Sequence, residues 1–266
     1  MKSKKEQELD NKILNAVSGL TKKTAELILA DEAIKHLQNY ANTVSIKRIG
    51  FNDHGPVHMR KVALNALKMT DLLHDAGIKL SLEKEGAGTF EDSKIAILIA
   101  AFIHDMGMTV GRQDHEKISV LLALPILDKL LKKIYPDNLE KQLIGRSMII
   151  ECIEGHMGYK KIHSLEAGII LIADGCDMEK GRARIPMMLT TESRVGDIHK
   201  YSASEIKKVK IEKGNKKPVK ITVEMNESVG FFQVEEVLFG KINSSTVKKY
   251  IELYAGVTDR PMKKYL

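Results

Sequence analysis

Apolar residues follow two different periods along the chain, and the change between them divides the sequence into two parts. Through most of the first 200 residues they recur every three or four positions, the spacing of one buried helix face. After residue 205 they recur every second position, the period of a strand with one buried face. The pattern predicts a mainly α-helical protein with a small C-terminal α+β appendage, divided into residues 1–202 and 203–266.

The first 75 residues contain three apolar stripes with helical spacing. Residues 14–20 and 25–37 predict two helices within the first 45 residues. A longer helix is predicted from Pro56, because proline suits a first helical position. His58 lies on the inward face of this helix, four residues before Val62. A single histidine on an apolar face is most often a hydrogen-bonded core residue, so His58 alone does not indicate a binding site.

The longest apolar run, Ile95–Ile103, ends directly before His104 and Asp105. A helix that is apolar on all sides lies inside the protein, so we predict a buried central helix. Gly107 is a typical helix stop. Burying an imidazole and a carboxylate is costly unless they are paired or bind a metal ion. The dipeptide alone fits a hydrogen-bonded pair and a metal site equally well.

Further polar residues stand at the ends of later predicted helices. His115 lies in the first turn of one helix, and His156 follows the helix predicted for residues 139–153. The next helix carries Asp174 and Asp177 on one face. Asp174 has apolar neighbours, where a carboxylate is costly unless compensated. Asp177 lies nearer the helix end, where solvent can reach it.

The C-terminal part begins with a predicted β-hairpin. Alternating apolar residues flank Gly214 and Asn215, which can turn the chain. Residues 231–238 then have helical spacing, whereas residues 247–257 fit a strand or a helix equally well.

Composition argues against several classes of protein. The 42 Lys and Arg against 35 Asp and Glu give a net charge of +7, which suits anionic small molecules without requiring them. No apolar run reaches the length of a membrane span, and none follows the N-terminal lysines as in a signal peptide. Tryptophan is absent, which does not favour a stacking surface for nucleic acid. Cys152 and Cys176 lie in apolar surroundings without a CxxC motif, so we predict reduced thiols and a cytoplasmic protein.

The isolated histidines and aspartates together form a candidate ligand set. Imidazole and carboxylate ligands suit Mn, Fe, Ni, Co or Zn, with Mg also open, rather than a metal that prefers thiolates. Six ligands exceed the four of one tetrahedral ion. They fit two divalent ions that share a bridging carboxylate, for which Asp105 is suitably placed. The candidate metal ligands are His58, His104, Asp105, His115, His156 and Asp174.

The order of these residues resembles the HD-domain superfamily of metal-dependent phosphohydrolases over residues 50–186. His58 is similar to the first-helix histidine of that family, AFIHDMG to its name-giving doublet, and LIADGCDM to its terminal aspartate. Members with two further histidines between doublet and terminal aspartate hold two metals, and His115 and His156 match those places. The members that cleave cyclic dinucleotides carry paired histidines and a Gly-Tyr-Pro signature. Here MGYK follows His156, so that activity is not expected.

The resemblance implies an HD-type helical bundle that hydrolyses a phosphomonoester or phosphodiester of a nucleotide or a related compound. A metal-activated hydroxide would attack phosphorus at the site bridged by Asp105, with His54 or Asp53 transferring a proton. Basic side chains would neutralise phosphate oxygens, although a solvated loop is the ordinary explanation of the KGRAR segment. The candidate substrate-binding residues are Arg60, Lys61, Arg112, Asp177, Lys180, Arg182 and Arg184.

Two other functions stay open on the same residues. The same ligand order on this fold also supports di-iron oxygenases that use O₂, but an uncharged substrate would not need the basic KGRAR segment. A non-catalytic sensor would have lost ligands, and none of the six is missing. The sequence identifies neither the substrate nor the native metal, and it leaves a homodimer open.

Overall fold

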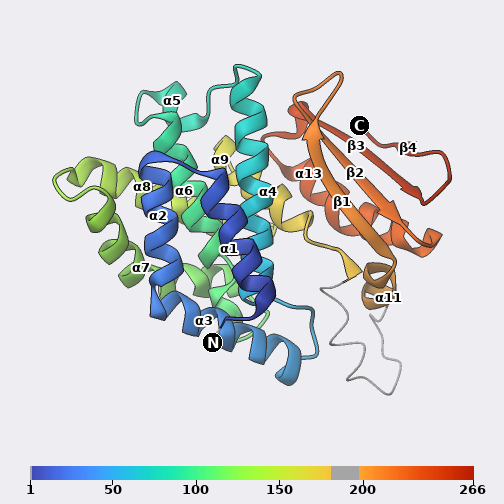
Figure 1. The fold of residues 1–266 in the computed structure, drawn as a ribbon, viewed down its shortest axis with the longest axis horizontal. Helices are drawn as coiled ribbons and strands as arrows, with labels where there is room; N and C mark the ends of the chain where they lie inside the picture. The colour runs from blue at the N-terminus through green and yellow to red at the C-terminus, as the bar shows by residue number, and fades with distance from the viewer. Residues whose placement is uncertain (1, 181–197) are drawn as a thin grey trace.

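A group of helices and a small sheet lie side by side in the structure (Figure 1). The structure is a computed structural model and describes residues 2–180 and 198–266. The helical part contains α1 (Lys4–Ala16), α2 (Gly19–Ala30), α3 (Glu32–Thr43), η1 (Val44–Arg48), α4 (Pro56–Asp75), α5 (Ser81–Glu85), α6 (Phe90–Ile103), η2 (Met106–Thr109), α7 (His115–Ile134), α8 (Leu139–Gly155) and α9 (Leu165–Gly175). The C-terminal part contains α11 (Ile198–Ser204), β1 (Ile206–Lys213), β2 (Val219–Met225), η3 (Ser228–Gly230), α12 (Phe231–Gln233), η4 (Val234–Phe239), α13 (Gly240–Ser244), η5 (Lys248–Tyr250), β3 (Ile251–Val257) and β4 (Lys263–Lys264). The predicted fold class, mainly α with a small C-terminal α+β part, is confirmed.

Helix α6 is the buried centre of the helical part, as its apolar run predicts. It packs against α2, α4, α8 and α9. Every side chain from Ile95 to Ile103 is at most 1% exposed. The helix begins with a capping box, in which Thr89 and Asp92 satisfy each other's backbone N–H groups. Its apolar residues therefore hold the following doublet, His104 and Asp105, in the interior.

The first 45 residues form three helices, so the prediction of two is wrong. The stripe over residues 25–37 is interrupted at Asp31, whose side chain accepts hydrogen bonds from the backbone N–H groups of Ala33 and Ile34. An aspartate in this capping position ends one helix and starts the next. The apolar positions keep their spacing across the break, which is why periodicity alone misses it.

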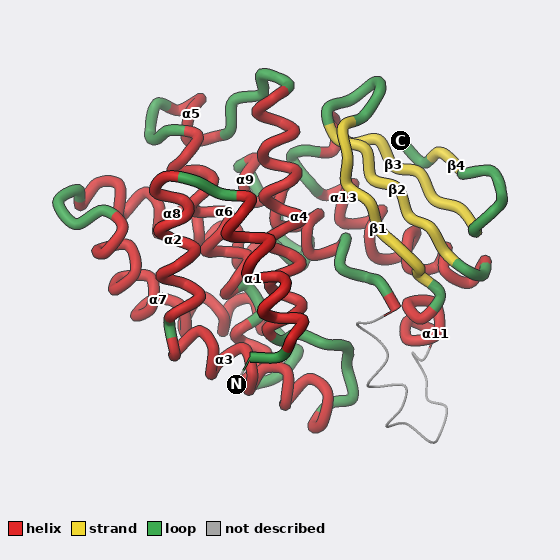
Figure 2. Tube along the Cα trace, in the orientation of Figure 1, coloured by secondary structure: helices red, strands yellow, loops and turns green. Residues whose placement is uncertain are grey.

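The C-terminal strands form one four-stranded sheet in the order β1-β2-β3-β4 (Figure 2). Strands β1 and β2 are antiparallel and form the predicted hairpin. Strand β3 runs parallel to β2, so the chain crosses over between them through the helical segment from η3 to η5. Residues 251–257 are therefore a strand, which the sequence left undecided.

The C-terminal module, residues 203–266, packs closely on the helical part. Strand β1 lies against α4, and α13 lies against α9. One hydrophobic core runs through both parts and includes Ile169 of α9 and Leu238 and Ile242 of the module. Whether residues 1–202 and 203–266 fold as separate domains stays a prediction. Within the described ranges, no helix is long and apolar enough to cross a membrane.

Candidate metal centre

Five helix ends bring the six predicted metal ligands together. His58 lies in the first turn of α4, His104 and Asp105 follow α6, His115 begins α7, His156 follows α8, and Asp174 lies in the last turn of α9. Taken as whole residues, none of the six is more than 7% exposed. Segments more than a hundred residues apart in sequence therefore place imidazoles and carboxylates in one buried cluster.

The carboxylate of Asp105 lies at the centre of this cluster. Its Oδ2 is 3.2 Å from His58 Nε2 and 3.4 Å from His104 Nε2. Its Oδ1 is 3.1 Å from His115 Nε2 and 3.2 Å from His156 Nε2. The two oxygens of one carboxylate therefore face two different pairs of histidines.

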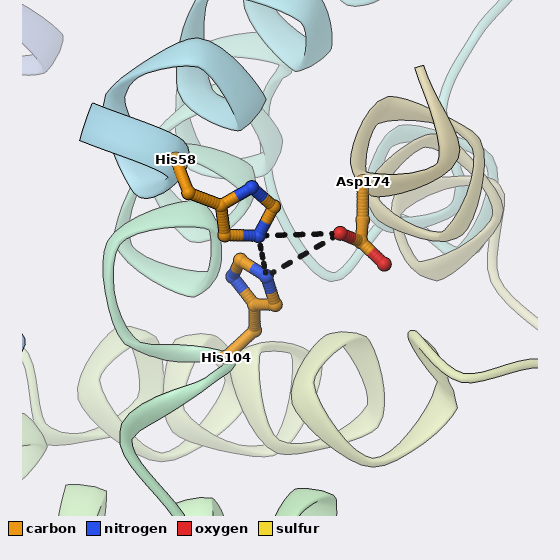
Figure 3. Close-up of side chains that lie close together, drawn as sticks. All are labelled: His58, His104 and Asp174. Carbon is orange, nitrogen blue, oxygen red and sulfur yellow. Dashed lines mark hydrogen bonds and ion pairs between the residues drawn. The ribbon is translucent and has the colours of Figure 1, made fainter. Parts of the chain in front are cut away.

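Asp174 adds a second carboxylate beside His58 and His104 (Figure 3). Its Oδ1 is 3.3 Å from His58 Nε2 and 3.9 Å from His104 Nε2, and these two nitrogens are 3.3 Å apart. The ligand atoms of these three residues all lie within 4.8 Å of one another, as do those of His104, Asp105 and His156. Each group has the spacing of ligands that can hold a metal ion.

Each histidine of the cluster is oriented through its Nδ1 atom. A carbonyl or carboxylate oxygen can only accept, so a histidine bonded to one carries its proton on Nδ1 and presents a lone pair at Nε2. Metal-binding histidines are typically held in this way. The acceptors are Asp177 Oδ2 for His58 (2.8 Å), the Ala101 carbonyl for His104 (3.0 Å), the Arg112 carbonyl for His115 (2.8 Å) and the Ile153 carbonyl for His156 (2.6 Å).

The chemistry of this donor set fits a metal ion. With the proton on Nδ1, the Nε2 atoms of His115 and His156 are both acceptors, yet they lie 3.1 Å apart. Asp105 Oδ1, a third acceptor, lies 3.1 and 3.2 Å from them. Acceptors cannot satisfy one another, whereas a divalent cation binds all three. Nitrogen and oxygen ligands suit Mn, Fe, Ni, Co or Zn.

Burial and the close contacts between histidines and carboxylates shift several pKa values in this cluster. Burial disfavours the charged form of Asp105, but its interactions with His104, His54 and His115 outweigh burial and hold the pKa of Asp105 well below its usual range. Burial also opposes the charge on His115, and the hydrogen bond and charge of Asp105 outweigh it and raise the pKa of His115. Burial lowers the pKa of His156 to about 4, which keeps that imidazole neutral.

Gly107 permits the close approach that places His115 beside Asp105. A Cβ atom on Gly107 would lie only 2.0 Å from the carbonyl oxygen of His115. The Gly107 N–H also donates to Ser119 Oγ at 2.7 Å. Helix α6 ends at Ile103, before this glycine, so Gly107 serves the packing of η2 on α7 rather than stopping α6.

His54 and Arg112 lie next to the ligand cluster. His54 is 5% exposed and its ring centroid is 5.8 Å from that of His58. Its Nδ1 donates to the Asn52 carbonyl at 2.7 Å, so its Nε2 is the acceptor for Arg112 Nη1 at 3.3 Å. Arg112 also lies over the ring of Phe51, 5.0 Å from its centroid. The structure thus places a guanidinium at the cluster and an imidazole that holds it.

The other predicted substrate-binding residues that the structure describes do not all lie together at one place. Asp177 is 3% exposed and accepts hydrogen bonds from Lys61 Nζ, at 2.9 Å, and from His58. Solvent therefore does not reach Asp177 as the sequence suggested. Arg60 is 4% exposed and donates to Asp10 at 2.5 Å, which directs its guanidinium to α1 rather than to the cluster. Lys180 is exposed. Arg182 and Arg184 lie outside the described residues.

Sequence reasoning missed Lys241 of α13. Its Nζ donates to Asp174 Oδ2 and, at 2.8 Å, to the carbonyl oxygen of His156. The sequence offers little signal for it, because Lys241 is one of 42 Lys and Arg and lies far from the other site residues. Only its place between the apolar Leu238 and Ile242 in a helical stretch is unusual for a solvated lysine.

Comparison with known proteins identifies a relative. No protein-family model and no solved structure matches the chain. The chain is 37% identical over 253 residues to the uncharacterized protein MJ1020 of Methanocaldococcus jannaschii, and the match covers 94% of this chain and 95% of that protein. Identity at this level over nearly the whole of both chains shows common descent. The chain therefore belongs to the same protein family as MJ1020.

Proposed function

We propose that the protein is a metal-dependent phosphohydrolase of the HD type that acts on a nucleotide or a related phosphate ester. One observation carries the proposal. Asp105 directs Oδ2 to His58 and His104 and Oδ1 to His115 and His156, all within 3.4 Å. This arrangement fits a carboxylate that bridges two metal positions, as the resemblance to HD-domain proteins implies.

Each metal position has its own ligands. Asp105 Oδ2, His58, His104 and Asp174 would hold one divalent ion. Asp105 Oδ1, His115 and His156 would hold the other. When bound, such ions supply Lewis acidity toward phosphoryl oxygens and lower the pKa of water to near neutrality. The protein keeps the ligands buried and oriented, which preserves this electrostatic effect.

Among the candidate basic residues that the structure describes, Arg112 is the best placed to bind the substrate phosphate. Its half-buried guanidinium lies at the cluster, its carbonyl orients His115, and His54 Nε2 holds one of its N–H groups. A guanidinium presents several donors and therefore still has N–H groups for phosphate oxygens. His54 then acts by positioning Arg112. Lys61 and Asp177 act farther out, through the hydrogen bond from His58 to Asp177.

The proposal is tested by measuring phosphate release. Metal-free protein is supplied with Mn²⁺, Fe²⁺, Ni²⁺ or Mg²⁺ and assayed with nucleoside mono-, di- and triphosphates and with dinucleotides. We expect release by the wild type and a loss in Asp105→Asn that exceeds the roughly 10–100-fold cost of disturbing an outer-sphere partner. The matched control is Asp92→Asn at the other end of α6, where the carboxylate pairs with Lys141 and touches no ligand.

Three outcomes would contradict the proposal. The first is no phosphate release by the wild type with any metal and substrate. The second is equal release by the wild type and Asp105→Asn. The third is O₂ uptake with Fe²⁺ and no phosphate release, which would support the oxygenase that the sequence also leaves open.

A further inference from the structure

The C-terminal module contributes a charged side chain to the metal centre. Lys241 of α13 donates to Asp174 Oδ2 and to the carbonyl oxygen of His156. Its side chain is 12% exposed and that of Asp174 9%. An ammonium is costly to bury unless it is paired, and here its partner is a candidate metal ligand. One cation thus connects the segment after α8 with the last turn of α9, which carry ligands of the two metal positions.

The geometry of Asp174 assigns separate tasks to its two oxygens. Oδ1 lies 3.3 Å from His58 Nε2 and 3.9 Å from His104 Nε2. Oδ2 accepts a hydrogen bond from Lys241 Nζ. Figure 3 shows the first oxygen directed toward the two imidazoles and the second directed away from them. A partial rotation of the carboxylate would break the bond to Lys241, so the ammonium fixes the plane of the carboxylate and leaves one oxygen toward the two imidazoles.

Two glycines on α9 allow the module to come this close. Gly168 and Gly175 are seven residues apart and therefore lie on one face of the helix. A Cβ atom on Gly175 would lie 3.1 Å from Cδ of Lys241, and one on Gly168 would lie 2.1 Å from Oγ1 of Thr246. The Ser245 hydroxyl also donates to the Gly168 carbonyl at 3.0 Å. The two glycines thus let the module pack closely along α9, the helix that carries Asp174.

We propose that Lys241 is a positioning residue of the metal centre and that the docked C-terminal module is needed for full metal affinity. The inference rests on the metal centre of the proposed function, but it concerns binding of the ion and not the reaction. Lys241 holds Asp174 as a ligand through one oxygen, Oδ1. The module is therefore part of the centre and not an attachment to a complete helical site.

The test measures metal affinity in the full-length protein. Metal-free wild type, Lys241→Met and Lys241→Gln are titrated with Mn²⁺ in a calorimeter. Methionine keeps the apolar stem but removes the donor, and we expect it to weaken binding by about 10–100-fold, the usual effect of losing an outer-sphere partner. Glutamine keeps an N–H donor and should lose less. Lys248→Met, an exposed lysine of the same module, is the matched control and should bind as the wild type does.

A second readout separates positioning from general stability. The visible absorption of Co²⁺-loaded protein depends on the number and arrangement of ligands, so it should change in Lys241→Met and stay unchanged in Lys248→Met. The unfolding temperature of each metal-free variant reports folding, and Lys241→Gln carries the test if the methionine variant does not fold.

The outcomes distinguish this inference from the proposed function. Wild-type affinity and an unchanged Co²⁺ spectrum in Lys241→Met would overturn the role of Lys241 and leave the phosphohydrolase proposal intact. Equal losses in Lys241→Met and Lys248→Met would overturn it as well. A wild-type protein that binds no metal would overturn both proposals.

Discussion

Helices α6 and α9 share two buried polar clusters, one near their first turns and one near their last. In the first cluster, Glu166 is fully buried and accepts from the backbone N–H of Ser81 (3.1 Å), the backbone N–H of Leu82 (3.2 Å) and Ser93 Oγ (2.7 Å). Every one of these contacts joins a donor to an acceptor. The protein itself completes the hydrogen bonding of this cluster, so its polar groups are compatible with a purely structural role.

The second cluster has the same burial but the opposite hydrogen-bond arrangement. Around Asp105 Oδ1, the lone pairs of His115 and His156 meet a carboxylate oxygen within 3.2 Å. Acceptors outnumber donors, so the protein needs a proton or a cation there. The comparison shows that burial alone does not identify a functional site. A mismatch of donors and acceptors is the better indicator of a binding site. Buried acceptors without donors are costly unless a bound ligand compensates them.

The largest difference between the clusters should appear when metal is added. A ligand that binds only the folded state at 100 times its Kd stabilises the protein by about 2.7 kcal/mol. For a chain of this size, we expect the unfolding temperature to rise by roughly 5–10 °C. Asp105→Asn should abolish the rise, and Glu166→Gln should keep it. Differential scanning calorimetry with and without a chelator measures the change in unfolding temperature. A wild type whose unfolding temperature does not change with metal would contradict the comparison.

Glu166→Gln should show the second-largest effect, and only on stability. The amide keeps one acceptor but turns an N–H group toward donors such as the backbone N–H groups of Ser81 and Leu82. A lost hydrogen bond to a charged group typically costs about 1.5–3 kcal/mol. Urea unfolding measures the loss, with the exposed Glu26→Gln of α2 as the matched control, expected within about 0.5 kcal/mol of the wild type. A weakened metal affinity in Glu166→Gln would show that the clusters are not independent.

The smallest expected effect is the change in metal affinity for each pH unit. Metal binding requires an unprotonated His115 Nε2, and the pKa of His115 is raised by Asp105 despite burial. Below that raised pKa a proton must leave, so each pH unit downward should weaken binding by up to about tenfold. His156, with a pKa of about 4, does not compete near neutral pH. Calorimetry in buffers of different ionisation enthalpy counts the released protons. Affinity that is constant from pH 8 to pH 5.5 would contradict this assignment.

The buried cluster of histidines and aspartates was predictable because its residues stand out locally. His104 and Asp105 follow a nine-residue apolar run, and Asp174 follows the shorter run over residues 169–173, so each carries its own signal of costly burial. Their order also carries the resemblance to HD-domain proteins. The mainly helical fold and the hairpin follow from the periods of 3.6 and 2, and the structure confirms both.

The missed features depend on contacts between distant segments. Arg60 lies on the same helix as His58 and has the charge of a phosphate ligand, but Asp10, fifty residues earlier, binds its guanidinium. Lys241 reaches Asp174 only because the module docks on α9, and no local pattern encodes that docking. Asp177 is buried and not solvated because it pairs with His58 and Lys61, which are distant in sequence. Periodicity gives the buried face of an element but not its partner.

Anomalous scattering from crystals soaked in Mn²⁺ or Co²⁺ tests the central claim most directly, namely that Asp105 divides the ligands into two groups. We predict two peaks, one on each side of the Asp105 carboxylate. One should lie among His58, His104 and Asp174, and the other between His115 and His156. A cluster without a peak, or a single peak that contacts only one oxygen of Asp105, would contradict the account.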